Sequence, residues 1–154
     1  MHKILAVNPG STSTKISCCI DDKKIFDRSI PIDDTLRASY KNIMDQLDLR
    51  YEQIWNVLCE IGETEHFDAV IGRGGLLAPM ESGTYFVNSA MKEYLKRAPR
   101  GEHASNLGAF LASRFAEKFS CPAFIADPVS VDEMSETARI SGAPEIERVS
   151  LVHA

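Results

Sequence analysis

The chain has 154 residues, of which 44% are hydrophobic and 25% are charged, and its formal net charge is −5. This length fits one domain with a substantial core, and the acidic balance lacks the basic surface of a nucleic-acid-binding protein. No segment reaches the roughly 20 apolar residues of a membrane span, and no signal-type apolar core follows the N-terminus, so we expect a cytoplasmic protein with neither membrane nor nucleic-acid partners.

The first third of the chain alternates apolar segments with short polar turns. Residues 3–8, 14–21 and 23–32 have the composition of strands, and Asp21-Asp22 has that of a turn. Pro31 places the end of the third strand at a sheet edge, because proline cannot donate a ladder hydrogen bond. These residues predict a three-stranded antiparallel meander.

Helices and short apolar strands alternate after the meander. An apolar stripe at helical spacing predicts a helix over residues 39–61, made by Ile43, Leu47, Ile54, Val57, Leu58 and Ile61, with Gly62 as its stop. Residues 69–71 and 123–126 are short apolar strands, and two more helices run from the cap at Asn88 to Pro99 and over 102–119. This order predicts an α/β fold with a mixed five-stranded sheet, the meander plus two crossover strands, flanked by helices.

The turn after the first strand has a composition that suits phosphate. Residues 8–15 read Asn-Pro-Gly-Ser-Thr-Ser-Thr-Lys, with backbone N–H groups and hydroxyls that can donate to anion oxygens. The candidate phosphate-binding residues are Gly10, Ser11, Thr12, Ser13 and Lys15. The alternative is an ordinary hairpin turn, and the absence of a GxxxxGK[ST] pattern excludes a Walker-type loop.

Three polar residues lie where predicted strands end. These residues are Asn8, Arg73 and Asp127. Ligands of open α/β sheets bind beyond the carboxyl ends of the strands, and an amide, a guanidinium and a carboxylate suit metal binding, charge neutralisation and substrate positioning in phosphoryl transfer. The alternatives are a surface ion pair for Arg73 and a turn cap for Asp127.

Two further features extend this candidate site. The glycines around Arg73, including Gly74 and Gly75, leave room for an anion to approach the guanidinium and make a possible substrate pocket. His103 lies where a helix begins and can line the same pocket; a structural histidine is the alternative, and its neighbour Glu102 can instead complement the helix dipole.

With these motifs in hand, the chain resembles the butyrate kinases of the acetate kinase family, within the superfamily of sugar kinases, heat-shock proteins and actin. The resemblance rests on residues 7–15, 72–77, 102–108, 127–134 and 138–146. It implies a ribonuclease H-like fold, with residues 1–154 as the N-terminal domain of a two-domain acyl kinase whose nucleotide-binding second domain is absent from this chain.

The resemblance also implies an activity and residue roles. The activity is phosphoryl transfer between ATP and a short-chain carboxylate with Mg²⁺, in a homo-oligomer; we expect no turnover from residues 1–154 alone. Asn8 matches the metal-binding asparagine, and Arg73, Asp127 and His153 match catalytic positions. An acetate or branched-chain acid kinase and a noncatalytic phosphate- or partner-binding domain are the alternatives.

Overall fold

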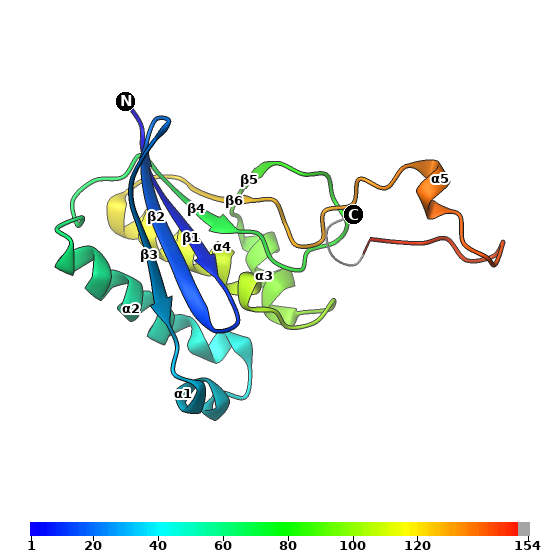
Figure 1. Ribbon diagram of the computed structural model, residues 1–154, viewed down its shortest axis with the longest axis horizontal. Helices are drawn as coiled ribbons and strands as arrows, with labels where there is room; N and C mark the ends of the chain where they lie inside the picture. Colours follow the sequence, from blue (N-terminus) through cyan, green and yellow to red (C-terminus); the bar gives the residue numbers. More distant parts are fainter. Residues whose placement is uncertain (151–154) are drawn as a thin grey trace.

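The computed structural model describes residues 1–150, which form a mixed six-stranded sheet with helices packed on it (Figure 1). The strand order is β3-β2-β1-β4-β6-β5. The strands are β1 (Lys3–Pro9), β2 (Ser13–Ile20), β3 (Lys23–Pro31), β4 (Ala69–Arg73), β5 (Thr84–Phe86) and β6 (Ala123–Ala126). The helices are α1 (Asp34–Ser39), α2 (Leu47–Glu60), α3 (Ser89–Arg97), α4 (Leu107–Phe119) and α5 (Glu136–Arg139).

The predicted meander is confirmed. β1 pairs antiparallel with β2, and β2 pairs antiparallel with β3, which lies at the sheet edge with Pro31 as its last residue. The register places Asn8 opposite Lys15 and Pro9 opposite Thr14. The residues between Pro9 and Thr14 therefore close a tight loop at the carboxyl end of β1.

The mixed α/β class is confirmed, but the expected number of five strands is wrong. β4 and β6 run parallel to β1 as predicted, and β5 adds a sixth, antiparallel strand beside β6. β5 has only three residues, too few for a periodic pattern to show. It forms because its backbone can pair with β6, and Phe86 and Phe124 pack across this pairing with ring centroids 4.4 Å apart.

Most of the helix expected over residues 39–61 is present, as a 3₁₀ turn over Ile43–Gln46 followed directly by α2, and the separate short helix α1 precedes it. Asp33 caps α1 by accepting hydrogen bonds from Thr35 and Leu36, and a capping box at Asn42 starts a 3₁₀ turn over Ile43–Gln46 before α2. The later helix over 102–119 is likewise a 3₁₀ turn, Ala104–Asn106, followed by α4. These local caps divide the helices because they satisfy the N–H groups at each start.

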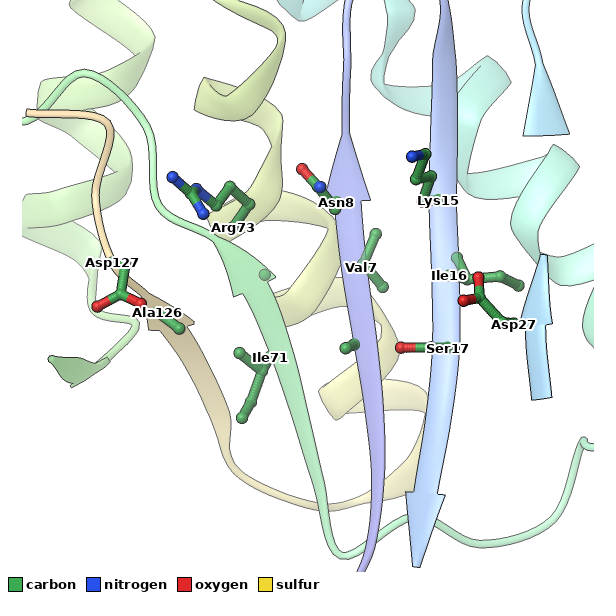
Figure 2. Close-up of a pocket in the computed structure, with 12 residues that line it drawn as sticks. Val7, Asn8, Lys15, Ile16, Ser17, Asp27, Ile71, Arg73, Ala126 and Asp127 are labelled. Atoms are coloured by element: carbon green, nitrogen blue, oxygen red, sulfur yellow. The ribbon is translucent and has the colours of Figure 1, made fainter. Parts of the chain in front are cut away.

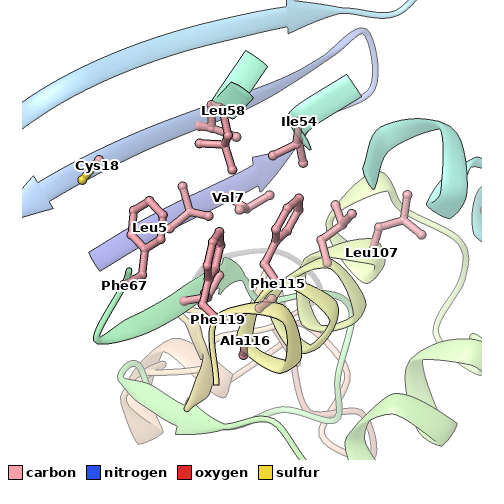
Figure 3. Close-up of a cluster of buried hydrophobic side chains, with 14 of the residues drawn as sticks. Leu5, Val7, Cys18, Ile54, Leu58, Phe67, Leu107, Phe115, Ala116 and Phe119 are labelled. Atoms are coloured by element: carbon pink, nitrogen blue, oxygen red, sulfur yellow. The ribbon is translucent and has the colours of Figure 1, made fainter. Parts of the chain in front are cut away.

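Helices α2 and α4 cover one face of the sheet and make the main core (Figures 1 and 3). Leu5 and Val7 of β1 are at most 1% exposed and point toward these helices. The core also contains Ile54 and Leu58 of α2 and Leu107, Phe115 and Phe119 of α4. Because side chains alternate along a strand, the neighbours Asn8 and Ala6 of β1 face the other side of the sheet.

Residues 128–131 stay buried, with Val131 bridged to Met80, and the chain beyond them extends away from the sheet as an arm that contains α5 (Figure 1). The Asp132 carboxylate accepts two hydrogen bonds from the Arg139 guanidinium, at 2.9 and 3.1 Å, which fixes the start of the arm. Within residues 1–150, no helix combines the length and the apolar character needed to cross a membrane.

Candidate functional site

A hollow of about 310 Å³ opens on the sheet face opposite the α2–α4 core (Figure 2). It brings together Asn8, Arg73 and Asp127, the three polar residues from the carboxyl ends of β1, β4 and β6. Its other polar lining residues are Lys15, Ser17 and Asp27, and its apolar ones include Ala6, Ile71 and Ala126. Parallel strands place their carboxyl ends at one edge, which is why residues far apart in sequence meet here.

The loop between β1 and β2 is tight at its base and open at its tip. The Gly10 N–H donates to the Ser13 carbonyl at 2.8 Å, and the Ile32 N–H donates to the Thr12 carbonyl at 3.0 Å. Ser11 and Thr12 are exposed. Gly10 has no positive φ, so the loop uses its lack of a side chain instead: a Cβ there would lie 3.2 Å from the Ser13 oxygen.

Arg73 is the last residue of β4 and is half-buried beside the hollow. Its position depends on a close approach of β4 to α4, because a Cβ on Gly72 would overlap the Gly108 carbonyl. Gly74 and Gly75 are buried as well, and added Cβ atoms would lie 2.6 Å from Pro128 and 2.7 Å from Asn106. The protein's own atoms fill this space, so these two glycines open no path to Arg73 and do not line the hollow.

Asp127 follows β6 with its carboxylate held at the edge of the hollow. Its φ of 41° lies in the left-handed region, which aspartate tolerates better than most residues. Its backbone N–H donates to the Gly83 carbonyl at 2.9 Å, and its Oδ1 accepts from the Gly83 N–H at 3.1 Å. This reciprocal pair fixes an exposed carboxylate in place, and local backbone strain of this kind is common at functional sites.

His103 lies away from Arg73 and Asp127. Its Nδ1 accepts a hydrogen bond from the Ser105 N–H at 3.1 Å and lies 2.6 Å from the Ser105 hydroxyl. His103 thereby caps the 3₁₀ turn before α4. His103 lines a second hollow together with Ser11 and Glu102. The Glu102 carboxylate accepts a hydrogen bond from the Ile43 N–H. The structure thus favours a capping role for His103. The predicted catalytic residue His153 lies outside the described residues.

Sequence reasoning missed Arg50, which lies under the loop between β1 and β2. Arg50 is 0% exposed, and its Nη1 donates to the Thr14 hydroxyl at 2.9 Å. A signal was available: Arg50 falls three residues after Leu47 and four before Ile54, within the apolar stripe of the helix. A charged residue at such a position is buried by the fold and calls for a specific reason.

The side-chain oxygens at the hollow suit a magnesium ion that is bound mainly by the phosphates of a substrate. Within residues 1–150, no cluster of three or more His, Cys, Asp or Glu side chains could enclose a metal ion. Mg²⁺ commonly retains several waters and takes only one or two protein oxygens besides phosphate. The Asn8 amide oxygen and the Asp127 carboxylate are exposed oxygens of the required type.

Comparison with solved structures relates the fold to that of acyl kinases. A propionate kinase from Francisella tularensis aligns over 94% of this chain and 41% of its own, with a TM-score of 0.55 and 17% identity. The acetate kinase of Porphyromonas gingivalis aligns over 94% of this chain and 42% of its own, with a TM-score of 0.57 and 14% identity.

Comparison of sequences is more specific, although no protein-family model matches the chain. Butyrate kinase 1 of Clostridium acetobutylicum is 46% identical over 155 aligned residues, which cover 100% of this chain and 44% of that protein. Probable butyrate kinase 2 of Caldanaerobacter subterraneus subsp. tengcongensis is 45% identical, with the same coverage. The chain thus spans less than half the length of these relatives. Along all of its own length it is a homologue of the butyrate kinases.

Proposed function

We propose that this chain provides the phosphate- and carboxylate-binding half of a kinase that transfers a phosphoryl group between ATP and a short-chain carboxylate. The observation that carries the proposal is the hollow where Asn8, Lys15, Arg73 and Asp127 meet. This combination of two cations, a carboxylate and an amide suits the charge neutralisation and positioning that phosphoryl transfer requires.

Each residue has a role that follows from its chemistry. The loop from Gly10 to Ser13 and Lys15 bind phosphate oxygens, and the planar guanidinium of Arg73 binds the substrate carboxylate in a bidentate manner. Asn8 and Asp127 would hold a Mg²⁺ ion together with the phosphates, and the ion would offset phosphate charge. A carboxylate substrate is already ionised at neutral pH, so Asp127 orients the reactants and need not act as a base.

The relatives support the wider parts of the proposal. Their greater length supports residues 1–154 as one domain, with a second, nucleotide-binding domain in the full-length kinase. Their name favours butyrate, with acetate or branched acids as alternatives, because one methylene changes binding by only about 1–3 kcal/mol. We extend the proposal to His153 as a catalytic residue, to a homo-oligomer and to a cytoplasmic location.

The test joins this chain to the part of Clostridium acetobutylicum butyrate kinase 1 that the alignment leaves uncovered. We expect ATP- and Mg²⁺-dependent acyl phosphate, trapped as hydroxamate, with rates compared from acetate to valerate and isobutyrate. Folded fusion protein that binds phosphate without forming acyl phosphate would contradict a catalytic role and support a noncatalytic binding domain.

Arg73→Ala in this fusion provides the residue-level test. We expect a higher carboxylate KM and a kcat lower by about 10²–10³-fold, the usual cost of removing one charge-stabilising donor. Lys118→Ala is the matched control, since Lys118 lies over the Trp55 ring near the C-terminal end of α4. Unchanged kinetics in Arg73→Ala would remove Arg73 from the site.

A further inference from the structure

Arg50 is a buried cation whose hydrogen-bond partners are all neutral. Its Nη1 donates to the Thr14 hydroxyl at 2.9 Å, and its Nε and Nη2 donate to Gln46 Oε1 at 3.2 and 2.9 Å. Arg50 and Thr14 are both 0% exposed, and Gln46 is 5% exposed. The ion pairs within residues 1–150 do not include Arg50.

Burying the Arg50 charge among neutral partners lowers the stability of the folded state. A charge removed from water is normally compensated by an opposite charge as well as by hydrogen bonds. Burial lowers the pKa of the Arg50 guanidinium to about 10, which is still high enough to keep it charged at neutral pH. A neutral apolar residue of similar size would avoid the cost, so the charge itself calls for an explanation.

The location of the guanidinium suggests that explanation. Thr14 follows Ser13 directly and pairs with Pro9 across the base of the β1–β2 loop. The Arg50 guanidinium therefore lies beneath the loop on the core side of the sheet, while Ser11 and Thr12 are exposed at the loop's tip. An anion bound by the loop would be separated from this cation by little more than the loop itself.

We propose that Arg50 is a positioning residue for phosphate: it holds the base of the Gly10–Ser13 loop through Thr14, and its charge is balanced by the phosphate that the loop binds. The inference rests on the proposed phosphate role of this loop. It assigns the loop a charge that the loop's own sequence lacks, because residues 10–13 contain no cation. The low dielectric around a buried charge makes such an interaction stronger than one across open solvent.

The test titrates residues 1–154 with inorganic phosphate and follows the amide signals of Gly10, Ser11 and Ser13 by ¹H–¹⁵N NMR. We expect Arg50→Met to remain folded, with a melting temperature equal to or above that of the wild type, and to bind phosphate about tenfold more weakly. Arg50→Lys keeps the charge and should stay within about threefold of the wild type. Lys118→Met, which removes a cation near the C-terminal end of α4, should bind phosphate like the wild type.

A second readout needs no substitution. The Nε–H signal of Arg50 in the wild-type chain should shift during the phosphate titration and saturate together with the Ser11 amide. An Nε–H signal that stays unchanged while the loop amides shift would overturn the inference, whether or not Arg50→Met folds.

The outcomes separate the two proposals. If phosphate shifts no loop amide in the wild type, the loop is not a phosphate site, and the roles proposed for the loop and for Arg50 both fail. If the wild type binds phosphate and folded Arg50→Met binds it equally well, only the role of Arg50 fails. Loss of binding in Arg50→Met with recovery in Arg50→Lys supports the role of its charge, because a purely structural arginine would change the melting temperature and not this affinity.

Discussion

The exits of β1 and β4 resemble each other in sequence and differ in structure. Each follows an apolar strand and contains glycine, yet Ser11 and Thr12 of the first are exposed, whereas Gly74 and Gly75 of the second are buried. The first exit presents hydroxyls above a buried cation, and the second is closed by the protein's own chain. Glycine therefore marks a close approach of the protein's own chain in both, and only the fold shows that the first exit still leaves its hydroxyl-bearing residues exposed.

The two exits should also differ in what a substitution changes: ligand binding at the exit of β1 and protein stability at the exit of β4. The second exit holds Arg73 in place through tight packing of β4 on α4, so changes there should affect folding first. The first exit has few buried side chains at its tip, so changes there should affect anion binding while leaving the fold intact. The predictions that follow test this division.

Gly72→Ala should have the largest effect. The added Cβ would overlap the Gly108 carbonyl, so β4 and α4 must separate, and we expect the free energy of unfolding to fall by about 3 kcal/mol or more. Urea denaturation measures the change. Gly142→Ala is the matched control, because nothing lies within 4 Å of its added Cβ; equal effects of the two substitutions would contradict the packing role of Gly72.

Asn106→Ala should cause the second-largest loss in the free energy of unfolding. Asn106 is fully buried, its Oδ1 accepts from the Leu76 N–H at 2.9 Å, and its Nδ2 donates to the Gly101 carbonyl at 3.2 Å. Leaving these backbone groups unpaired should cost about 2–3 kcal/mol in the same denaturation experiment. Asn88→Ala, which removes only the exposed cap of α3, should cost about 1 kcal/mol; the reverse order would refute the comparison.

Ser11→Ala tests the open exit. Because the side chain is exposed, we expect the free energy of unfolding to change by no more than about 0.5 kcal/mol. Loss of one hydrogen bond to phosphate should weaken phosphate binding by about three- to tenfold in the NMR titration. Ser89→Ala is the control, because Ser89 is an exposed serine at the start of α3. A Ser11→Ala variant that loses stability without losing affinity would reverse the assignment.

The smallest effect concerns pH and the arm. Hydrogen bonds from the Arg139 guanidinium hold the pKa of Asp132 below its usual range. This interaction therefore stabilises the folded arm above an unfolded-state pKa of about 3.9 and is lost as the pH falls through the lower folded pKa. NMR titration of the Asp132 carboxyl measures it. Arg139→Gln should move that pKa upward, and an unchanged pKa would show that Arg139 is not its cause.

Much of the fold could be predicted from local patterns. Strand periodicity and turn residues indicated the β1–β2–β3 meander, and the Asn88 cap indicated the start of α3, where Asn88 Oδ1 accepts from the Met91 N–H at 2.9 Å. β5 was missed because its three residues become a strand only by pairing with β6. The long helix starts later than expected, because the capping box at Asn42 begins a 3₁₀ turn ahead of α2, and the Asp33 cap starts the separate helix α1 that was not expected.

The sequence by itself determined the α/β class, the hydroxyl-rich loop and the placement of Asn8, Arg73 and Asp127 at strand ends, because these depend on periodicity and turn chemistry within short segments. Only the tertiary structure decided that His103 caps a turn away from these residues and that Arg50 lies beneath the loop. The His103 cap is itself a local contact with Ser105, but the separation of His103 from the three strand-end residues and the burial of Arg50 against Thr14 depend on packing between segments distant along the chain.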